Sequence, residues 1–343
     1  MDGAGGIWSI LVVLVVACAA SAALIAALRP LFRRYAMARP NARSSHREPT
    51  PQGGGAAVIA ATLVVAWSAI LLSTTDWHAG LPQYLALTAG VLLLAVVGAV
   101  DDIRTLPAAP RLLAQFAAVA LVIAMVPQEL RLVPALPLVL ERLLLVIAGV
   151  WFVNLVNFMD GIDWITVAEV VPVTGGLLLL GWLGAVPFEA MLLAAALLGA
   201  TLGFAPSNRP VAALFLGDVG SLPIGLLLGF LLLGLAFNGH IAAALLLPLY
   251  YLADASLTLA RRLIAREPFW QAHRSHFYQR ATDRGFTVSK IVTHIFVLNL
   301  LLVALAIVSV ARPEAATSLA ALAAGGMLVG LTLARFARGK SGG

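Results

Sequence analysis

Five aspartates in this sequence have the type and spacing of groups that bind a divalent cation. Asp101 and Asp102 are adjacent, Asp160 and Asp163 frame an Asp-Gly-Ile-Asp tetrapeptide, and Asp218 lies in Gly-Asp-Val-Gly-Ser. Each group adjoins a long apolar run, where an unpaired charge is costly unless it meets water, a metal or a partner. Clustered carboxylates need a counter-ion, and hard oxygen ligands favour Mg²⁺ or Mn²⁺. The aspartates therefore predict a site for a divalent cation.

A basic, glycine-rich loop precedes the second apolar run and is a candidate phosphate contact. The loop spans residues 43–55 and contains Arg47, Gly53 and Gly54. Backbone N–H groups of such a segment can turn toward an anion. Close packing between helices is the other common reason for glycine in a membrane protein, and it remains an alternative here.

A second basic segment, His273-Arg274-Ser275-His276, follows the ninth apolar run. A helical conformation would place His273 and His276 on one face, with Arg280 one turn further along. Zinc binding by this pair is disfavoured, because neither a cysteine nor a third histidine lies nearby. Solvated loop histidines remain an alternative. We favour contact with a phosphate or pyrophosphate.

The elements that must position these residues are membrane helices. Of the 343 residues, 61% are hydrophobic and 11% are charged, whereas an ordinary soluble domain is about one quarter charged. The composition predicts an all-α polytopic membrane protein in which residues 1–343 form a single integral membrane domain. In such a protein, the basic residues behind the formal net charge of +6 primarily reflect membrane topology. We do not expect nucleic acid as a partner.

Ten or eleven apolar runs are long enough to cross a bilayer, which takes about 17 to 25 residues. The boundary between the eighth and ninth runs is the weakest. The predicted runs are 7–28, 54–73, 82–100, 111–127, 138–157, 166–184, 188–205, 221–237, 240–260, 290–310 and 315–334.

The gaps between these runs differ sharply in charge. The odd-numbered gaps and the carboxyl-terminal tail, counted with Arg111 and Lys290 at the gap borders, hold 19 of the 22 Lys and Arg residues. The positive-inside rule therefore places them in the cytoplasm, with the amino terminus outside and the carboxyl terminus inside. All five aspartates then fall at the cytoplasmic ends of helices, so they share one membrane face.

Four motifs, in this order along the chain, resemble those of the polyprenyl-phosphate N-acetylhexosamine-1-phosphate transferases, the glycosyltransferase family 4 superfamily. The resemblance covers nearly the whole chain. The motifs are Asp101-Asp102, Asn154-x-x-Asn157-Phe-Met-Asp160-Gly-Ile-Asp163, Phe215-Leu-Gly-Asp218-Val-Gly-Ser221-Leu and His273-Arg-Ser-His276.

The resemblance implies an enzyme of the bacterial inner membrane with its catalytic cleft in the cytoplasm. Such enzymes transfer a sugar 1-phosphate from a UDP-N-acetylhexosamine to undecaprenyl phosphate, release UMP and need Mg²⁺. Membrane lipid is a further expected partner, and a homodimer is one open oligomeric state.

The same resemblance implies roles for individual residues. The implied catalytic residues are Asp101, Asp102, Asp218, His273 and His276, and the implied metal ligands are Asp218, Asp102 and Asn157. The groups expected to bind the substrates are Asn157, Asp160, Asp163, Arg47, Gly53, Gly54 and Arg274. Which of Asp101 and Asp102 binds the metal, and which activates the lipid phosphate, stays open.

The two-histidine motif resembles the branch that initiates O-antigen, a lipopolysaccharide component, and other surface glycans. The peptidoglycan-precursor branch, which usually has a run of histidines there, is the alternative within the superfamily. Trp164 replaces a glycine of many relatives, so the identity of the UDP-sugar stays open. A cation-coupled transporter is the alternative from another class, but the helix centres are nearly free of charge and no internal repeat is evident.

Overall fold

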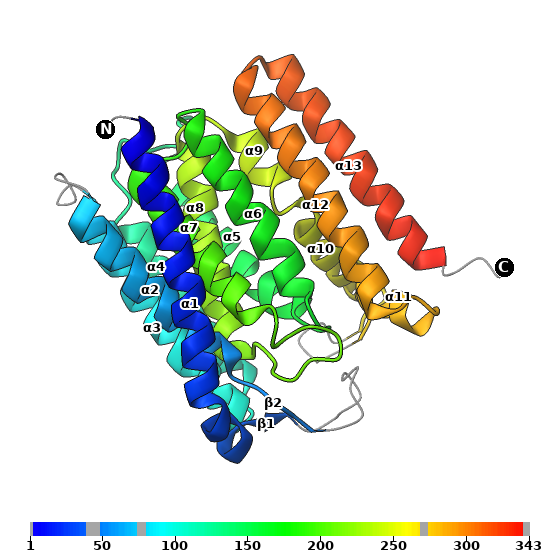
Figure 1. Ribbon diagram of the computed structural model, residues 1–343. Coiled ribbons are helices and arrows are strands. Elements are labelled where there is room, and N and C mark those ends of the chain that lie inside the picture. The colour runs from blue at the N-terminus through cyan, green and yellow to red at the C-terminus, as the bar shows by residue number, and fades with distance from the viewer. Residues whose placement is uncertain (1–2, 39–48, 74–79, 268–273, 339–343) are drawn as a thin grey trace.

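The computed structural model describes residues 3–38, 49–73, 80–267 and 274–338. Within these ranges the chain forms a bundle of thirteen helices and one two-stranded ladder (Figure 1). The elements are α1 (Gly3–Tyr35), β1 (Met37–Ala38), β2 (Thr50–Pro51), α2 (Gly54–Ser73), α3 (Leu81–Ile103), α4 (Ala108–Ala124), α5 (Leu138–Met159), α6 (Ile165–Trp182), α7 (Phe188–Phe204), α8 (Asp218–Phe237), α9 (Ile241–Leu246), α10 (Leu249–Ile264), α11 (Phe277–Asp283), α12 (Val288–Ala311) and α13 (Ala315–Arg338).

The prediction of an all-α bundle is confirmed, and helices occupy all eleven predicted apolar runs. Among the residues that the structure describes, eight helices are long and apolar enough to cross a membrane, and α4 and α7 are shorter apolar helices. The ninth predicted run is not one continuous helix, because the helix is interrupted between α9 and α10. Pro248 precedes the first residue of α10. Proline cannot donate the N–H that a continuous helix requires. The chain is a multi-pass membrane protein.

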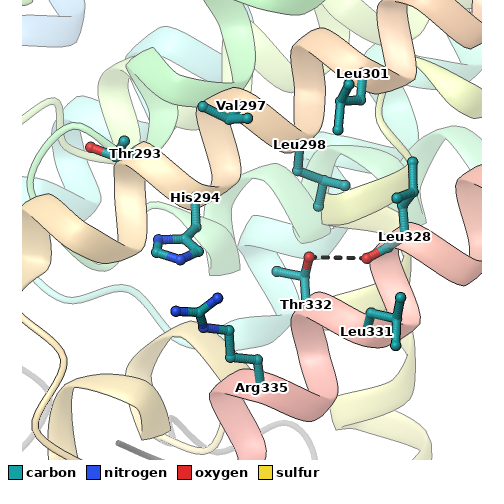
Figure 2. Close-up of a pocket in the computed structure, with 9 residues that line it drawn as sticks. All are labelled: Thr293, His294, Val297, Leu298, Leu301, Leu328, Leu331, Thr332 and Arg335. Atoms are coloured by element: carbon teal, nitrogen blue, oxygen red, sulfur yellow. Dashed lines mark hydrogen bonds between the residues drawn. The ribbon is translucent and has the colours of Figure 1, made fainter.

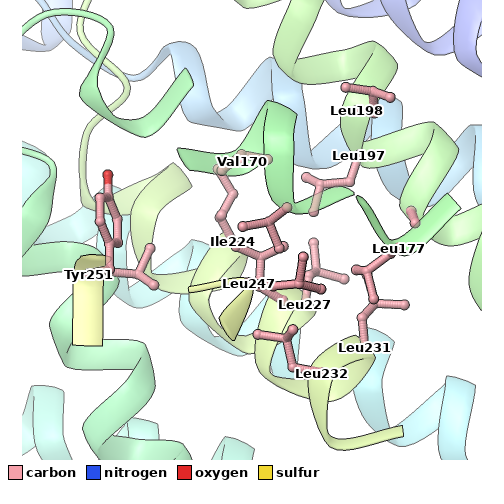
Figure 3. Close-up of a cluster of buried hydrophobic side chains, with 14 of the residues drawn as sticks. Val170, Leu177, Leu197, Leu198, Ile224, Leu227, Leu231, Leu232, Leu247 and Tyr251 are labelled. Atoms are coloured by element: carbon pink, nitrogen blue, oxygen red, sulfur yellow. The ribbon is translucent and has the colours of Figure 1, made fainter. Parts of the chain in front are cut away.

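The buried core lies between α6, α7, α8 and the α9–α10 segment. Figure 3 shows Leu177 of α6, Leu197 of α7, and Leu227 and Leu231 of α8 packed together, with Leu247 of the α9–α10 connection beside them. Helices α7 and α8 are apolar on all sides, as is typical of a helix surrounded by other helices. The outer helices instead expose large apolar side chains, as expected of surfaces that face lipid.

The segment before α2 is fastened to the segment before α8. The backbone N–H of Phe215 donates to the carbonyl of Pro51 at 2.8 Å. The N–H groups of Gly54 and Gly55 donate to the carbonyls of Phe215 and Leu216, at 3.0 and 2.8 Å. These bonds fix the first turn of α8 at the end of the bundle that also carries β1, β2 and α11 (Figure 1).

Two glycines let α2 and α3 approach α8 more closely than any larger residue would allow. A Cβ on Gly55 would lie 2.2 Å from the Cα of Gly220. A Cβ on Gly98 would lie 2.3 Å from the backbone carbonyl oxygen of Asp218. Small residues commonly permit such backbone contact between membrane helices. The position of Asp218 therefore depends on backbone packing as well as on side chains.

We expect Gly98→Ala to lower the thermal midpoint of the purified protein and to impair its activity. The added methyl group must push α3 away from the first residue of α8, and overpacking of this kind costs about 1–3 kcal/mol. Gly234→Ala is the matched control, since Gly234 lies on α8 with no atom within 4 Å of an added Cβ. Thermal unfolding of both variants in the same detergent makes the comparison. Equal midpoints would contradict the tight contact.

Candidate active site

Asp102, at the carboxyl end of α3, holds the amino end of α8. Its Oδ1 accepts the N–H of Asp218 at 2.9 Å, and its Oδ2 accepts the N–H of Val219 at 3.1 Å. These are two of the free N–H groups at the start of a helix, where a carboxylate is favoured. Gly217 precedes them at φ +79°, and a Cβ there would lie 2.4 Å from Asp102 Oδ2. Asp102 therefore positions Asp218.

Arg111 of α4 joins the carboxylates of Asp101 and Asp218. Its Nη1 lies 2.5 Å from Asp101 Oδ2 and 3.6 Å from Asp218 Oδ2. Asp101 Oδ1 also accepts the N–H of Leu106 at 2.5 Å. The sequence interpretation used Arg111 only as a topological charge and missed this role. The available signal was a cation at the start of the helix that follows the aspartate pair.

Asn157, near the end of α5, approaches Asp218 from the other side. Its Nδ2 donates to Asp218 Oδ1 at 2.7 Å and to the hydroxyl of Ser221 at 2.9 Å. The Asp218 side chain remains 27% exposed despite these contacts. The ends of α3, α4, α5 and α8 thus converge on one partly open carboxylate. We call Asp101, Asp102, Arg111, Asn157 and Asp218 the acidic cluster.

Asp160 follows α5 directly and is partly buried beside this cluster. Its Oδ1 accepts a hydrogen bond from the hydroxyl of Thr166 at 2.5 Å. The pKa of Asp160 is raised from 3.8 to about 7, mainly by burial and also by the charges of Asp102 and Asp163, against the lowering effect of the Thr166 hydrogen bond. The carboxyl group therefore exchanges its proton near neutral pH.

This pKa predicts a pH-dependent stability. A folded-state pKa raised above the unfolded value means that the folded protein holds the Asp160 proton more tightly, so this contribution is lost as pH rises toward about 7. In EDTA, we expect the thermal midpoint of the wild type to fall relative to Asp160→Asn between about pH 5 and pH 7 and then to level off. Parallel curves for the two proteins would contradict the raised pKa.

Asp163 and Trp164 fix the loop between α7 and α8. Asp163 is 5% exposed, and its Oδ2 accepts the N–H of Ala212 at 3.0 Å. Trp164 adopts φ +63°, where its N–H bonds Asn208 Oδ1 at 2.8 Å and its indole Nε1 bonds the carbonyl of Ala205 at 2.6 Å. The predicted role of Asp163 in the substrate site stays a prediction, and the buried carboxylate favours an indirect role through this loop.

His276 is buried at the amino end of α11 and is oriented by a carboxylate that the sequence interpretation missed. Asp254 of α10 is fully buried, and its Oδ1 lies 3.3 Å from His276 Nδ1. The N–H groups of Phe277 and Tyr278 also donate to Asp254, at 2.9 and 3.2 Å. A lone acid inside an apolar run is a signal of function, and it could have identified Asp254.

Helix α11 rests against the end of α5. The hydroxyl of Tyr278 donates to the carbonyl of Phe158 at 3.1 Å, and the rings of Phe158 and His276 lie 6.4 Å apart. A Cβ on Gly161 would lie 2.1 Å from the Tyr278 hydroxyl oxygen, so only glycine fits there. Burial raises the pKa of Tyr278 well above its usual value, which keeps the hydroxyl a donor. These contacts bring His276 beside the Asn157–Asp163 segment.

The structure describes some of the remaining predicted substrate contacts, but not all of them. Arg274 bonds the Thr282 hydroxyl at 2.9 Å and lies 3.3 Å from Asp283, so it is fastened to α11. Gly54 stays a predicted phosphate contact, although its N–H donates to the carbonyl of Phe215. Gly53 lies at φ +108° against the ring of Phe32, which explains the glycine by conformation and packing. Arg47 and His273 lie outside the described residues.

The oxygen atoms of the acidic cluster suit a magnesium ion that has few protein ligands. In the part of the chain that the structure describes, no group of three or more His, Cys, Asp or Glu side chains is placed to hold a metal. Mg²⁺ is commonly bound by one or two carboxylates together with substrate phosphates. Asp218 and the amide oxygen of Asn157 fit that pattern. Asp102 fits it less well, because both of its oxygens accept bonds from α8.

Comparison with known proteins shows what this arrangement is similar to. The model of glycosyl transferase family 4 matches residues 84–236, a stretch that contains the whole acidic cluster. The chain is similar to glycosyl transferase family 4 over this stretch. The histidine motif lies beyond the matched residues, so its connection to the family 4 core rests on the contacts of α11 with α5 and α10.

Three relatives show how widely the family resemblance extends. A decaprenyl-phosphate N-acetylglucosaminephosphotransferase of Mycolicibacterium smegmatis is 31% identical over 57% of this chain and 52% of its own length. A probable undecaprenyl-phosphate N-acetylglucosaminyl 1-phosphate transferase of Bacillus subtilis is 24% identical over 80% of this chain and 78% of its own. A phospho-N-acetylmuramoyl-pentapeptide-transferase of Bartonella quintana is 30% identical over 43% of this chain and 45% of its own. The chain therefore spans about half the length of two of these three family 4 relatives.

Proposed function

We propose that this chain transfers the sugar 1-phosphate of a UDP-N-acetylhexosamine to undecaprenyl phosphate and releases UMP. The observation that carries the proposal is the partly exposed Asp218 carboxylate, flanked by Arg111 and Asn157 where four helix ends converge. The printed names of the Mycolicibacterium and Bacillus relatives, both polyprenyl-phosphate N-acetylglucosamine phosphotransferases, support the same reaction class.

In the proposed reaction an oxygen of the lipid phosphate forms a bond to the phosphorus that carries the sugar. The bond from that phosphorus to the UMP oxygen breaks, and its electron pair leaves with UMP. Both reactants are polyanions, so positioning and charge neutralisation are most of the catalytic task. Arg111 is the described cation of the acidic cluster that can meet a phosphate oxygen while Asp101 fixes its direction.

Asp101 and Asp102 act in this proposal mainly by positioning. Asp101 holds Arg111, and Asp102 holds the first turn of α8. A phosphomonoester is already largely ionised at neutral pH, since its second pKa is about 6. The lipid phosphate therefore needs no strong base. This reasoning favours neither aspartate as an obligatory proton acceptor.

We further propose that Asp218 and the amide oxygen of Asn157 hold the Mg²⁺ expected for this reaction. When bound, the ion supplies positive charge to the phosphate oxygens of the donor and of the leaving UMP. The protein's part is to keep both oxygen donors in place. Asp102 and Ser221 do so through their bonds to the Asp218 N–H and to Asn157 Nδ2.

The proposed location is the bacterial inner membrane, with the acidic cluster facing the cytoplasm. The distribution of Lys and Arg along the sequence supports this orientation. A lipid acceptor would keep its tail in the bilayer and its phosphate at the membrane surface, where the water-soluble donor arrives. We propose that the product feeds O-antigen or a related surface glycan. The match to the Bartonella relative keeps the peptidoglycan-precursor branch as the second candidate.

The test is UMP release by the purified protein in detergent, with undecaprenyl phosphate, Mg²⁺ and a panel of UDP-N-acetylhexosamines. UDP-N-acetylmuramoyl-pentapeptide is included as the donor of the other branch. We expect release with one N-acetylhexosamine donor, and none when the lipid phosphate is omitted or EDTA replaces Mg²⁺. Release only from the muramoyl-pentapeptide donor would reassign the branch. Absence of release with every donor would overturn the proposal.

A further inference from the structure

A groove between α12 and α13 lies apart from the acidic cluster and has a defined chemistry. Its volume is about 390 Å³, within the usual range for small-molecule sites. The lining residues come from α12 and α13 alone, whereas the acidic cluster is built from α3, α4, α5 and α8. They are Thr293, His294, Val297, Leu298, Leu301, Leu328, Leu331, Thr332 and Arg335 (Figure 2).

The groove is apolar along most of its length and basic at one end. Leu298, Leu301 and Leu328 line the apolar part, and Figure 2 shows Arg335 pointing toward His294 at the other end. The first turns of α12 and the last turn of α13 form that end. Helix α13 ends at Arg338. Along the membrane normal, the groove thus passes from an apolar part to a basic end.

His294 is held with one ring nitrogen available. Its Nδ1 lies 2.6 Å from the carbonyl of Lys290, so this nitrogen carries a proton and donates it. Its ring also packs against Phe286 and Phe336, with centroids 6.4 and 6.3 Å away. Nε2 is therefore the nitrogen left to meet a ligand, and it donates to a phosphate oxygen when the ring is protonated on both nitrogens.

The basic end has no acidic partner on its own helices. Between Val288 and Arg338 the sequence contains a single acid, Glu314, which lies between α12 and α13 at their other end. Asp283 of the neighbouring α11 forms an ion pair with Arg274, at 3.3 Å. The positive charge of Arg335 is thus available to a ligand.

We propose that this groove binds an anionic diacyl phospholipid, with its phosphate on Arg335 and His294 and an acyl chain along the leucines. Basic pockets between transmembrane helices on the cytoplasmic side are a recognised setting for anionic lipid headgroups. Charge complementarity selects the headgroup, and the apolar lining selects a ligand with a hydrocarbon tail. A free phosphate would use only the basic end.

The test is retention of lipid by the purified full chain, measured by native mass spectrometry after addition of phosphatidylglycerol or phosphatidylcholine. We expect the wild type to retain phosphatidylglycerol and Arg335→Gln to retain about tenfold less, because it loses a charge-assisted hydrogen bond to phosphate. Arg338→Gln is the matched control: it removes the same charge from the same helix end outside the groove. We expect it to retain lipid within about twofold of the wild type.

A second variant tests the apolar part separately. Leu328→Trp should fill the groove and reduce phosphatidylglycerol retention while leaving Arg335 in place. Equal retention by the Arg335 and Arg338 variants would overturn the proposal, as would equal retention of phosphatidylcholine. Displacement of the lipid by millimolar inorganic phosphate would indicate a free-anion site instead. Thermal midpoints without added lipid show that each variant is folded before it is compared.

Discussion

Asp218→Asn is expected to lower the rate of UMP release by about three orders of magnitude, the scale of losing a central electrostatic group. The substitution preserves the size of the side chain but removes the charge that faces Arg111 and lies within 2.7 Å of Asn157 Nδ2. It also places an amide beside Asn157, where two donors can oppose each other. The proposed metal site loses the carboxylate whose side chain is 27% exposed.

The measurement is UMP release at saturating donor over a series of Mg²⁺ concentrations. Glu314→Gln is the control, since this acid lies between α12 and α13, away from the acidic cluster. We expect the control to match the wild type and Asp218→Asn to keep its thermal midpoint, because the backbone bonds to Asp102 do not involve the Asp218 side chain. A variant within tenfold of the wild type, with the same Mg²⁺ dependence, would refute the central role of Asp218.

Asp254→Asn is expected to be the most damaging change away from the acidic cluster. The carboxylate of the native Asp254 contacts His276 and two backbone N–H groups of α11. It also accepts hydrogen bonds from the hydroxyls of Tyr250 at 3.0 Å and Thr258 at 3.3 Å. An asparagine offers one acceptor oxygen, and its NH₂ group would face donors. Breaking a fully buried charged network typically costs about 3–5 kcal/mol. We therefore expect a lower thermal midpoint and a displaced His276.

Thr258→Val separates this effect from ordinary destabilisation, because it removes one long hydrogen bond and leaves the Asp254 charge. We expect it to cost about 1 kcal/mol and to leave the kinetics nearly unchanged. Asp254→Asn should instead raise KM for the UDP-sugar more than it lowers kcat, if the histidine motif contacts the donor pyrophosphate. Equal falls in kcat for both variants, with KM unchanged, would indicate a role in stability alone.

The helices could be predicted from sequence because the membrane leaves few alternatives. A spanning segment must satisfy its backbone hydrogen bonds internally, so a long apolar run is almost always a helix. The aspartates of the site were predictable for a related reason, since charge at the end of such a run requires a partner. The break before α10 was less visible, because Pro248 sits within the predicted run 240–260, with apolar residues on both sides.

The missed residues depend on which helices become neighbours. Arg111 is a site residue because α4 brings it between Asp101 and Asp218, and Asp254 is one because α11 folds back onto α10. Neither the composition nor the residue spacing shows that α4 lies beside the two aspartates or that α11 lies against α10. Gly54 shows the same limit, since an anion-binding loop and a packing contact have one sequence signature. The hydrogen bond from the Gly54 N–H to the carbonyl of Phe215 favours the packing contact.

The glycine contacts beneath Asp218 give the two sides of the site different freedom to move. On one side, α2 and α3 meet α8 through backbone atoms at Gly55 and Gly98, so no side-chain rotation can relax that wall. On the other side, α11 is held through side chains, by Asp254 and by the Tyr278 hydroxyl. Rotamers and hydrogen bonds can exchange without breaking a helix, whereas backbone contact cannot. Any closure around a bound donor must therefore come from the α10–α11 side, with the α2–α3–α8 wall as its fixed frame.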